Sequence, residues 1–230
     1  MRHVLLTGGW AHDFEAHAPT LVEVIESKRS MSTEMCATVD ELATALAEPA
    51  DLLTVYACWF RMLDDRYNAE QRAGFATETP APVRDAISDH VRAGRPVLAV
   101  HTATICFDDW PEWQQLIGGG WDWARSHHPE PGPMRVDYEP VAADLFGAVE
   151  SFEVIDERYT DLAVHAASRV VATSALPLEH ARQPAAWCRE HASGSRVFTS
   201  TLGHDSTSLR APGHVSLLAG AVRWLLKGGE

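Results

Sequence analysis

The chain of 230 residues has few basic side chains for its length. Its 19 Lys and Arg stand against 32 Asp and Glu, which gives a formal net charge of −13. Nucleic acids and anionic membrane surfaces both reward clustered Lys and Arg. The charge therefore argues against both as partners, whereas a small-molecule ligand remains compatible with it.

Cysteine is also scarce. Cys36, Cys58, Cys106 and Cys188 are widely separated and form no CxxC pair. Zinc knuckles and disulfide frameworks need closely and regularly spaced cysteines. The pattern indicates neither, and we expect the four thiols to be reduced and mostly structural.

Long apolar runs and nucleotide motifs are absent from the sequence. Val4–Leu6, which follows the first three residues, is far too short for a signal peptide or a membrane-spanning helix, so we expect a cytoplasmic protein. Gly8 and Gly9 belong to no GxGxxG motif and no P-loop lysine is present, so no nucleotide cofactor is expected.

Neither an internal repeat nor a linker divides the chain, which indicates one domain over residues 1–230.

The first hundred residues alternate between short apolar runs and amphipathic segments. Pro19 is expected to open the first helix, Thr38 to cap the second, and Pro82 to precede a third that ends at Gly94. Strand and helix in alternation predict an α/β fold with a doubly wound, mainly parallel sheet. The expected strands are Val4–Thr7, Met31–Ala37, Leu52–Tyr56 and Val97–Val100.

The second half of the sequence is less regular. The segment from Pro111 to Pro133 is rich in Trp and His, and such a long loop inside a compact domain is usually functional, so it is a candidate wall or lid. A core-facing stripe from Val215 to Leu225 predicts a closing helix. The expected strands of this half are Met134–Tyr138, Phe152–Ile155, Val170–Thr173, Ala185–Cys188 and Val197–Thr201.

Three of the expected strands run almost directly into a histidine. These residues are His12, His101 and His204. If the strands are parallel, their carboxyl ends share one edge of the sheet, and that edge is where open α/β sheets bind ligands. His101 is the sharpest candidate, as a metal ligand, a base or an acid, although a hydrogen-bonded structural histidine at a strand end is the alternative.

Carboxylates accompany two of these histidines. Asp13 follows His12 and can either face a ligand or cap a helix. Asp205 follows His204 and can orient the imidazole, coordinate a metal or lie in a solvated turn.

Further candidates lie in the irregular half. His127 and His128 are adjacent, so we expect at most one of them to face a metal. Glu157 and Tyr159 offer a carboxylate and a phenol after an apolar run, although the sequence alone favours a surface pair between an acidic residue and Arg158. Trp121 and Trp123 can stack on a sugar face, although packing in the core is the more usual role of such residues.

Taken together and in order, the motifs resemble the ThuA-like, trehalose-utilisation family, within the superfamily of class I glutamine amidotransferases. The resemblance covers nearly the whole chain. It is carried by residues 8–14 (GGWAHDF), 100–103 (VHTA), 109–113 (DWPEW), 126–129 (SHHP), 156–159 (DERY) and 202–205 (LGHD).

This resemblance implies a flavodoxin-like fold and a role in sugar catabolism. His101 and Thr102 stand where an amidotransferase needs a Gly-x-Cys-x-Gly nucleophile turn, and Cys106 lies too far past the strand to replace it. Glutamine hydrolysis is therefore not expected. The resemblance also raises Glu157 and Tyr159 from surface residues to site candidates.

Within such a family, isomerisation or cleavage of a 3-keto-glycoside is the expected chemistry, because the keto group acidifies the proton on the neighbouring carbon. A base could then form an enediolate, whose charge a divalent metal (Zn or Mn) would stabilise. Hydrolysis of another small substrate with a metal-bound water, or a non-catalytic sugar-binding or regulatory domain, remain the alternatives, and a homo-oligomer is open. The expected residues are His101, Glu157 and Tyr159 for catalysis; His12, His101, His128, His204 and Asp205 for the metal; and Asp13, Trp121 and His127 for the substrate.

Overall fold

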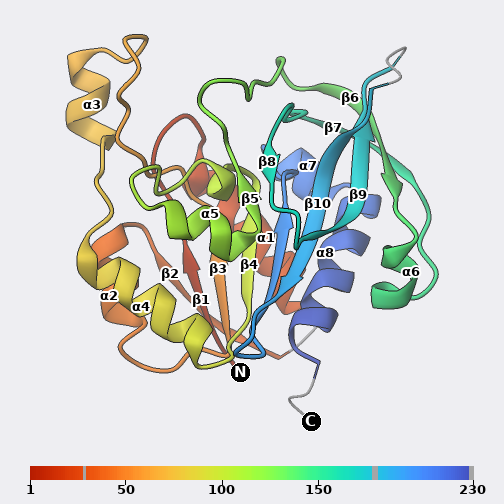
Figure 1. Cartoon of the computed structure of the whole chain (residues 1–230), viewed down its shortest axis with the longest axis horizontal. Helices are drawn as coiled ribbons and strands as arrows, with labels where there is room; N and C mark the ends of the chain where they lie inside the picture. Colours follow the sequence, from red (N-terminus) through yellow and green to blue (C-terminus); the bar gives the residue numbers. More distant parts are fainter. Residues whose placement is uncertain (28–29, 178–180, 228–230) are drawn as a thin grey trace.

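The computed structural model describes residues 1–27, 30–177 and 181–227. Its centre is a nine-stranded sheet in which β2, β1, β3, β4 and β11 run parallel, and β10, β9, β6 and β7 continue the sheet in antiparallel fashion, in that order (Figure 1). The strands are β1 (Arg2–Leu6), β2 (Ser32–Cys36), β3 (Leu52–Val55), β4 (Val97–Val100), β6 (Gly132–Tyr138), β7 (Phe152–Asp156), β9 (Arg169–Ala175), β10 (Gln183–Glu190) and β11 (Arg196–Ser200), with a separate pair β5 (Gly119–Gly120) and β8 (Ala163–Val164).

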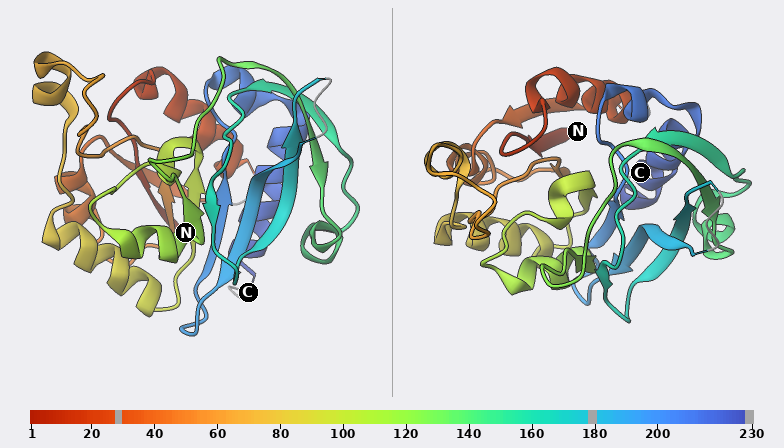
Figure 2. Two further views of the ribbon diagram at one scale, coloured as in Figure 1. Left: turned by 45° about the horizontal axis from the view of Figure 1, so that its top comes forward. Right: turned by 90° about the horizontal axis from the view of Figure 1, so that it is seen from above.

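Helices cover both faces of this sheet (Figure 2). α1, α7 and α8 pack against one face, and α2, α4 and α5 against the other. The helices are α1 (Phe14–Glu26), α2 (Val39–Ala45), α3 (Ala69–Phe75), α4 (Ala81–Arg92), α5 (Pro111–Ile117), α6 (Val141–Phe146), α7 (Ser206–Arg210) and α8 (Pro212–Leu225), with a 3₁₀ turn at His101–Thr104.

The strands alternate their side chains between two apolar cores. Leu5 of β1 packs on the side of α1 and α8, whereas Val4 and Leu6 pack on the side of α2 and α4. All three are fully buried, as a strand covered on both faces requires. The predicted doubly wound α/β fold is confirmed, and its parallel half has the flavodoxin-like order 2-1-3-4 followed by β11.

Two expectations about local structure are wrong. Pro19 lies inside α1, because the helix already begins at Phe14, where Asp13 Oδ1 accepts a hydrogen bond from the backbone N–H of Ala16 at 3.1 Å. The segment from Pro111 to Pro133 is not wholly irregular either. Pro111 starts α5, where its missing N–H costs no helical hydrogen bond.

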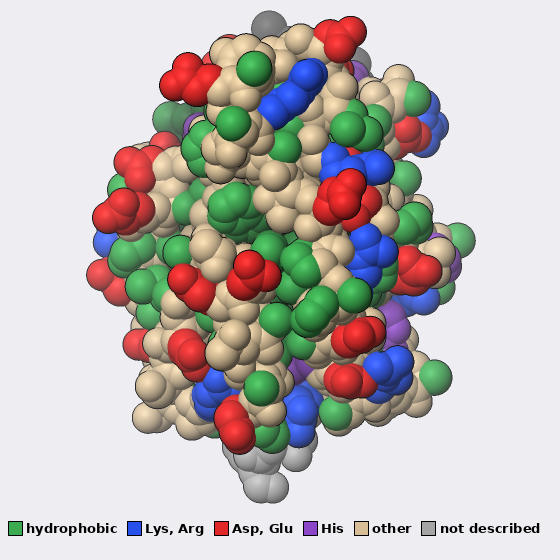
Figure 3. Space-filling model, turned by 90° about the vertical axis from the view of Figure 1, so that its left-hand side faces the viewer, with side chains coloured by type: hydrophobic (Ala, Val, Ile, Leu, Met, Phe, Trp, Pro, Cys, Tyr) green, Lys and Arg blue, Asp and Glu red, His purple; other side chains and the backbone are tan. Residues whose placement is uncertain are grey.

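Acidic and basic side chains are interspersed on the face of the molecule that carries α2, α3 and α4, and neither sign forms a continuous patch there (Figure 3). Among the described residues, no helix combines the length and the apolar character that a membrane crossing requires.

Candidate functional site

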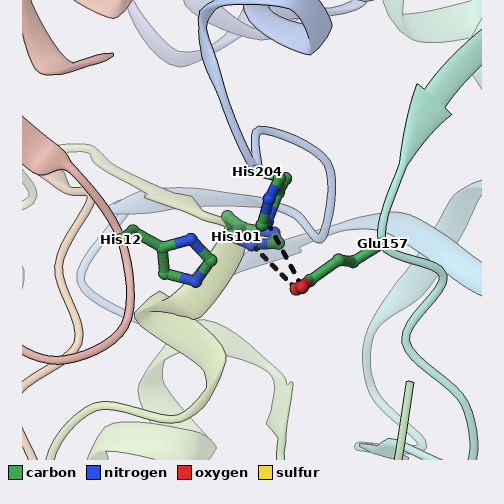
Figure 4. A group of neighbouring side chains, drawn as sticks. All are labelled: His12, His101, Glu157 and His204. Atoms are coloured by element: carbon green, nitrogen blue, oxygen red, sulfur yellow. Dashed lines mark ion pairs between the residues drawn. The ribbon is translucent and has the colours of Figure 1, made fainter. Parts of the chain in front are cut away.

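The predicted convergence of three histidines at one sheet edge is found in the structure. His101 follows β4 directly, His204 follows β11, and His12 lies in the loop between β1 and α1. The imidazole centroids of His12 and His101 are 4.9 Å apart, as are those of His12 and His204 (Figure 4). The parallel register of β1, β3, β4 and β11 produces this arrangement, because it brings their carboxyl ends to the same edge.

Two glycines bring the chain from β1 into this crevice. Cys58 donates its backbone N–H to the carbonyl of Gly8 at 2.8 Å, and Trp10 donates to the carbonyl of Cys58 at 2.9 Å. A Cβ atom on Gly9, whose φ is +102°, would lie 2.3 Å from the Cys58 carbonyl oxygen. Only glycine permits this approach, which keeps the loop beside β3 and directs His12 towards the crevice.

His101 occupies a strained turn. Its φ of +54° is in the left-handed region, and a single non-glycine residue held there costs on the order of 1 kcal/mol. The imidazole is fully buried, and Nδ1 lies 2.7 Å from the backbone carbonyl oxygen of Thr201. Since a carbonyl only accepts, Nδ1 carries a proton, and in the neutral imidazole Nε2 presents its lone pair to the site.

Glu157 joins the histidines from the far edge of the sheet. It follows β7, and the chain then crosses back over the sheet, where Thr160 pairs with His127 and β8 pairs with β5. Its carboxylate oxygens lie 3.5 Å from His101 Nε2 and 3.3 Å from His204 Nδ1 (Figure 4). The second half of the chain thus supplies the acidic member of a group whose histidines come from the parallel half of the sheet.

The charges in this group are strongly coupled. Burial favours the neutral acid, yet the imidazoles of His101 and His204 hold the pKa of Glu157 well below its usual range. The contact with Glu157 in turn raises the pKa of His204, against the effect of burial. Burial and the neighbouring His101 lower the pKa of His12 to about 3, so His12 is neutral near pH 7.

His12, His101, Glu157 and His204 form a metal-ligand set, which we call the ligand cluster. One nitrogen or oxygen atom from each lies within 4.8 Å of the others. Two observations fit a cation at their centre. His101 Nε2 lies 3.5 Å from a carboxylate oxygen of Glu157, close enough for both atoms to contact one ion, and the buried His204 Nδ1 has no partner with hydrogen-bond geometry. Three imidazoles and one carboxylate suit Zn²⁺ or Mn²⁺.

A second carboxylate, Asp156, fixes two of these residues in place. Its oxygens accept hydrogen bonds from the backbone N–H groups of Glu157 at 2.7 Å, Gly203 at 2.8 Å and His204 at 3.3 Å. The hydroxyl of Ser208 donates to it as well. Through these hydrogen bonds Asp156 holds the turn after β11 against the end of β7. Its side chain is only 1% exposed and does not line the pocket.

Tyr159 and His128 lie beside the ligand cluster. The Tyr159 hydroxyl is 3.3 Å from His101 Nε2, and burial raises the pKa of Tyr159 well above its usual range, which keeps it a hydrogen-bond donor. His128 Nδ1 lies 3.0 Å from the carbonyl oxygen of Pro129 and 3.5 Å from Glu157 Oε1. Nδ1 therefore carries a proton, and Nε2 is the ring nitrogen that can act as an acceptor.

Three of the residues expected in the site lie outside this group. Asp13 and Asp205 cap α1 and α7, each accepting a hydrogen bond from a backbone N–H group of the first helical turn. His127 is exposed and its Nδ1 contacts the backbone carbonyl of Arg125. Trp121, by contrast, is only 8% exposed and lines the pocket beside Tyr159.

The pocket also contains residues to which the sequence analysis assigned no role in the site. Most of them come from the segment between β3 and α4. The length of this segment and its lack of an apolar stripe could have indicated a functional role, because long connections in compact domains are often functional. The lining residues missed are Trp10, Ala11, Cys58, Phe60, Arg66, Tyr67, Gln71, Thr102 and Ile105.

Comparison with known proteins gives one family and several structural neighbours. The family model described as ThuA, trehalose utilisation, matches residues 3–225. A ThuA-like protein from Parabacteroides merdae has a TM-score of 0.75 at 16% identity, covering 99% of this chain and 90% of that one. A second, from Bacteroides uniformis, has a TM-score of 0.71 at 15% identity, covering 99% and 92%.

More distant similarity links the fold to the glutamine amidotransferases. An enzyme of that type from Thermotoga maritima has a TM-score of 0.50 at 10% identity, covering 99% of this chain and 90% of that one. No curated protein matches the chain. The identities of these structures are low enough that they bear on the fold alone.

Proposed function

The chain belongs to the ThuA family of trehalose-utilisation proteins, and on this premise we propose that it is a metal-assisted enzyme acting on 3-keto-glycosides. The observation that supports the chemistry is the ligand cluster at the base of a pocket on the carboxyl edge of the sheet. A pocket of this kind with convergent polar groups is the usual form of an active site in an α/β fold.

The residues of the cluster fit a charge-stabilising role better than a proton-transfer role. The lowered pKa makes Glu157 a weak base, and His101 Nε2 and His204 Nδ1 both face the same carboxylate. We therefore assign His12, His101, Glu157 and His204 to holding a divalent ion. What such an ion supplies when bound is stabilisation of negative charge that develops on a substrate oxygen.

His128 and Tyr159 are then the groups left to act on the substrate. His128 Nε2 takes the proton from the carbon next to the keto group, and the electron pair of that C–H bond moves towards the keto oxygen. Tyr159, protonated and buried, donates a hydrogen bond to a substrate oxygen. The resulting enediolate either regains a proton at a different carbon, which is isomerisation, or expels the glycosidic oxygen, which takes up a proton as it leaves.

Proton exchange with solvent tests this step directly. Incubation of the protein with 3-keto-trehalose and related keto-glycosides in D₂O, with Zn²⁺ or Mn²⁺, should place deuterium on the carbon next to the keto group, as followed by NMR. Glu157→Gln should abolish both exchange and bound metal, whereas His127→Ala should retain both. If no keto-glycoside exchanges or reacts under any of these conditions, the proposed function is wrong.

A further inference from the structure

The pocket that contains the ligand cluster extends beyond it, with a cavity volume of about 350 Å³. Its inner part is polar and includes Glu157, His204 and the Tyr159 hydroxyl. Its outer part is lined by aromatic rings from four separate places in the sequence. We call these rings, Trp10, Phe60, Tyr67 and Trp123, the outer aromatic group.

The rings of the outer aromatic group contact one another and connect to the inner part. Tyr67 lies 6.0 Å from Trp10 and 5.7 Å from Phe60, between ring centroids, and Phe60 lies 5.3 Å from Trp123. Trp121 joins the two parts of the pocket, because it contacts Trp123 at 6.3 Å and Tyr159 at 5.3 Å. A ligand seated at the ligand cluster can therefore continue outwards between aromatic rings.

Most of this outer part is aromatic surface, and its two long polar side chains are already engaged in part. Gln71 lines it, but its side-chain oxygen already accepts the backbone N–H of Asn68 at 2.8 Å. Arg66 also lines it, but its guanidinium pairs with Asp64 at 3.5 Å and lies over the Tyr67 ring. A second sugar would bring several hydroxyl groups that need partners, and leaving them unpaired costs binding energy.

The segment that carries Tyr67 is anchored to the rest of the molecule by Met62, which is buried in the core at its start, and otherwise by its rings. In the described part of the chain, every hydrogen bond of residues 62–76 stays within residues 60–77, with Arg72 donating to the carbonyls of Met62 and Asp64. α3 contains no buried residue and stands away from the sheet (Figure 1). Trp10 contacts the segment through the rings of Tyr67 and Phe75.

We propose that the outer aromatic group binds a flat aromatic ring, so that the substrate is an aryl glycoside whose sugar lies at the ligand cluster. The identity of the sugar part rests on the function proposed above, whereas the aromatic part rests on the pocket alone. Aromatic rings in offset or edge-to-face contact satisfy one another without hydrogen bonds, which is what this part of the pocket offers.

Binding of unreactive glucosides tests the proposal separately from turnover. Phenyl glucoside, methyl glucoside and trehalose carry no keto group, so their affinities can be measured by calorimetry with the intact protein. We expect phenyl glucoside to bind about tenfold more tightly than methyl glucoside, and more tightly than trehalose. Trp123→Ala and Tyr67→Ala should remove most of this preference, since each deletes one ring of the outer aromatic group.

Leu63→Ala is the matched control. Leu63 is 67% exposed in the same segment and does not line the pocket, so the preference for the phenyl group should persist. Equal affinities for the two glucosides, tighter binding of trehalose, or no detectable binding of phenyl glucoside at millimolar concentration would each overturn the proposal. Inactivity towards every keto-glycoside would contradict the proposed function while leaving these affinities unaffected.

Discussion

The carboxylate of Asp156 accepts a hydrogen bond from the backbone N–H of Gly203 at 2.8 Å, across 47 residues of sequence. This bond joins the end of β7, which carries Glu157, to the turn that carries His204. The two residues are members of the same ligand cluster, and the distance between them depends on this junction.

Asp156→Asn should loosen that junction. An amide in place of the carboxylate removes the negative charge from a buried site. It also places an N–H group opposite backbone N–H donors, with which it cannot form a hydrogen bond. We expect the free energy of unfolding to fall by about 2–4 kcal/mol and the metal affinity to fall with it. Urea denaturation and metal titration measure the two effects.

Asp205→Asn is the matched control for this substitution. Asp205 caps α7, and asparagine caps a helix about as well as aspartate. Stability should therefore change little, and the affinity for metal should be retained. Loss of metal in this variant would instead support the sequence-based expectation that Asp205 is a ligand.

Replacement of His128 by alanine should reduce catalysis far more than replacement of its neighbour His127. His128→Ala removes the proposed base, and we expect kcat towards a keto-glycoside to fall on the order of 100-fold or more. His127→Ala should leave kcat close to that of the wild type, because its exposed imidazole does not line the pocket. Equal losses in the two variants would remove the reason for assigning the base to His128.

A divalent ion that binds only the folded protein should raise the stability of the wild type. At a free ion concentration of 100 times Kd the gain is on the order of 2.7 kcal/mol. His12→Gln should lose most of this gain, since it removes one member of the ligand cluster. His17→Gln is the control, because that imidazole contacts Ser206 outside the cluster. Thermal unfolding with and without Zn²⁺ or Mn²⁺ measures the difference.

Acid should destabilise the protein through His3, far from the pocket. Burial lowers the pKa of His3 to about 4 from an ordinary 6.5, and its two ring nitrogens contact the hydroxyls of Thr33 and Thr54. As the pH falls from 6.5 to 4, the unfolded chain binds a proton at this residue before the folded one does. Stability is therefore lost over that interval, by about 3 kcal/mol.

His3→Gln tests this contribution. The free energy of unfolding of the variant should fall less than that of the wild type between pH 7 and pH 4. At pH 7 it should already be lower, because a well-packed buried side chain has been replaced. Urea denaturation at several pH values gives both curves. Parallel curves would mean that His3 does not contribute to the acid sensitivity.

Backbone amides of α3 should exchange with solvent much faster than those of β4. The helix buries no residue and depends on ring contacts, whereas β4 is fully buried between β3 and β11. Phenyl glucoside should slow the exchange of residues 62–76 if it binds against Tyr67. Hydrogen exchange followed by mass spectrometry resolves the two segments.

The parallel half of the fold was predictable because its signals are local. Short apolar runs such as Val97–Val100 are typical of buried strands, and parallel pairing then places the histidines after them at one edge. The start of α1 was placed too late because Pro19 is a strong helix-start signal, whereas the cap by Asp13 is a weaker one. The sequence around a helix start does not show which of two competing start signals tertiary packing will favour.

The second half of the site depended on information that is not local. Nothing in residues 156–159 indicates that the chain crosses back over the sheet after β7, so only the family resemblance brought Glu157 into the site. Apart from Trp123, the rings of the outer aromatic group were missed for the same reason. Trp10 and Tyr67 are far apart in the sequence, and only the folded chain brings their ring centroids to within 6.0 Å of each other.

The ligand cluster draws one residue each from the loop after β1, the turn after β4, the end of β7 and the turn after β11. It therefore cannot form until strands from both ends of the chain have joined the same sheet, and contacts of such long sequence separation form slowly. Binding of a metal probe during refolding would consequently report the last step of assembly. A partly folded chain would show secondary structure well before it could hold the ion.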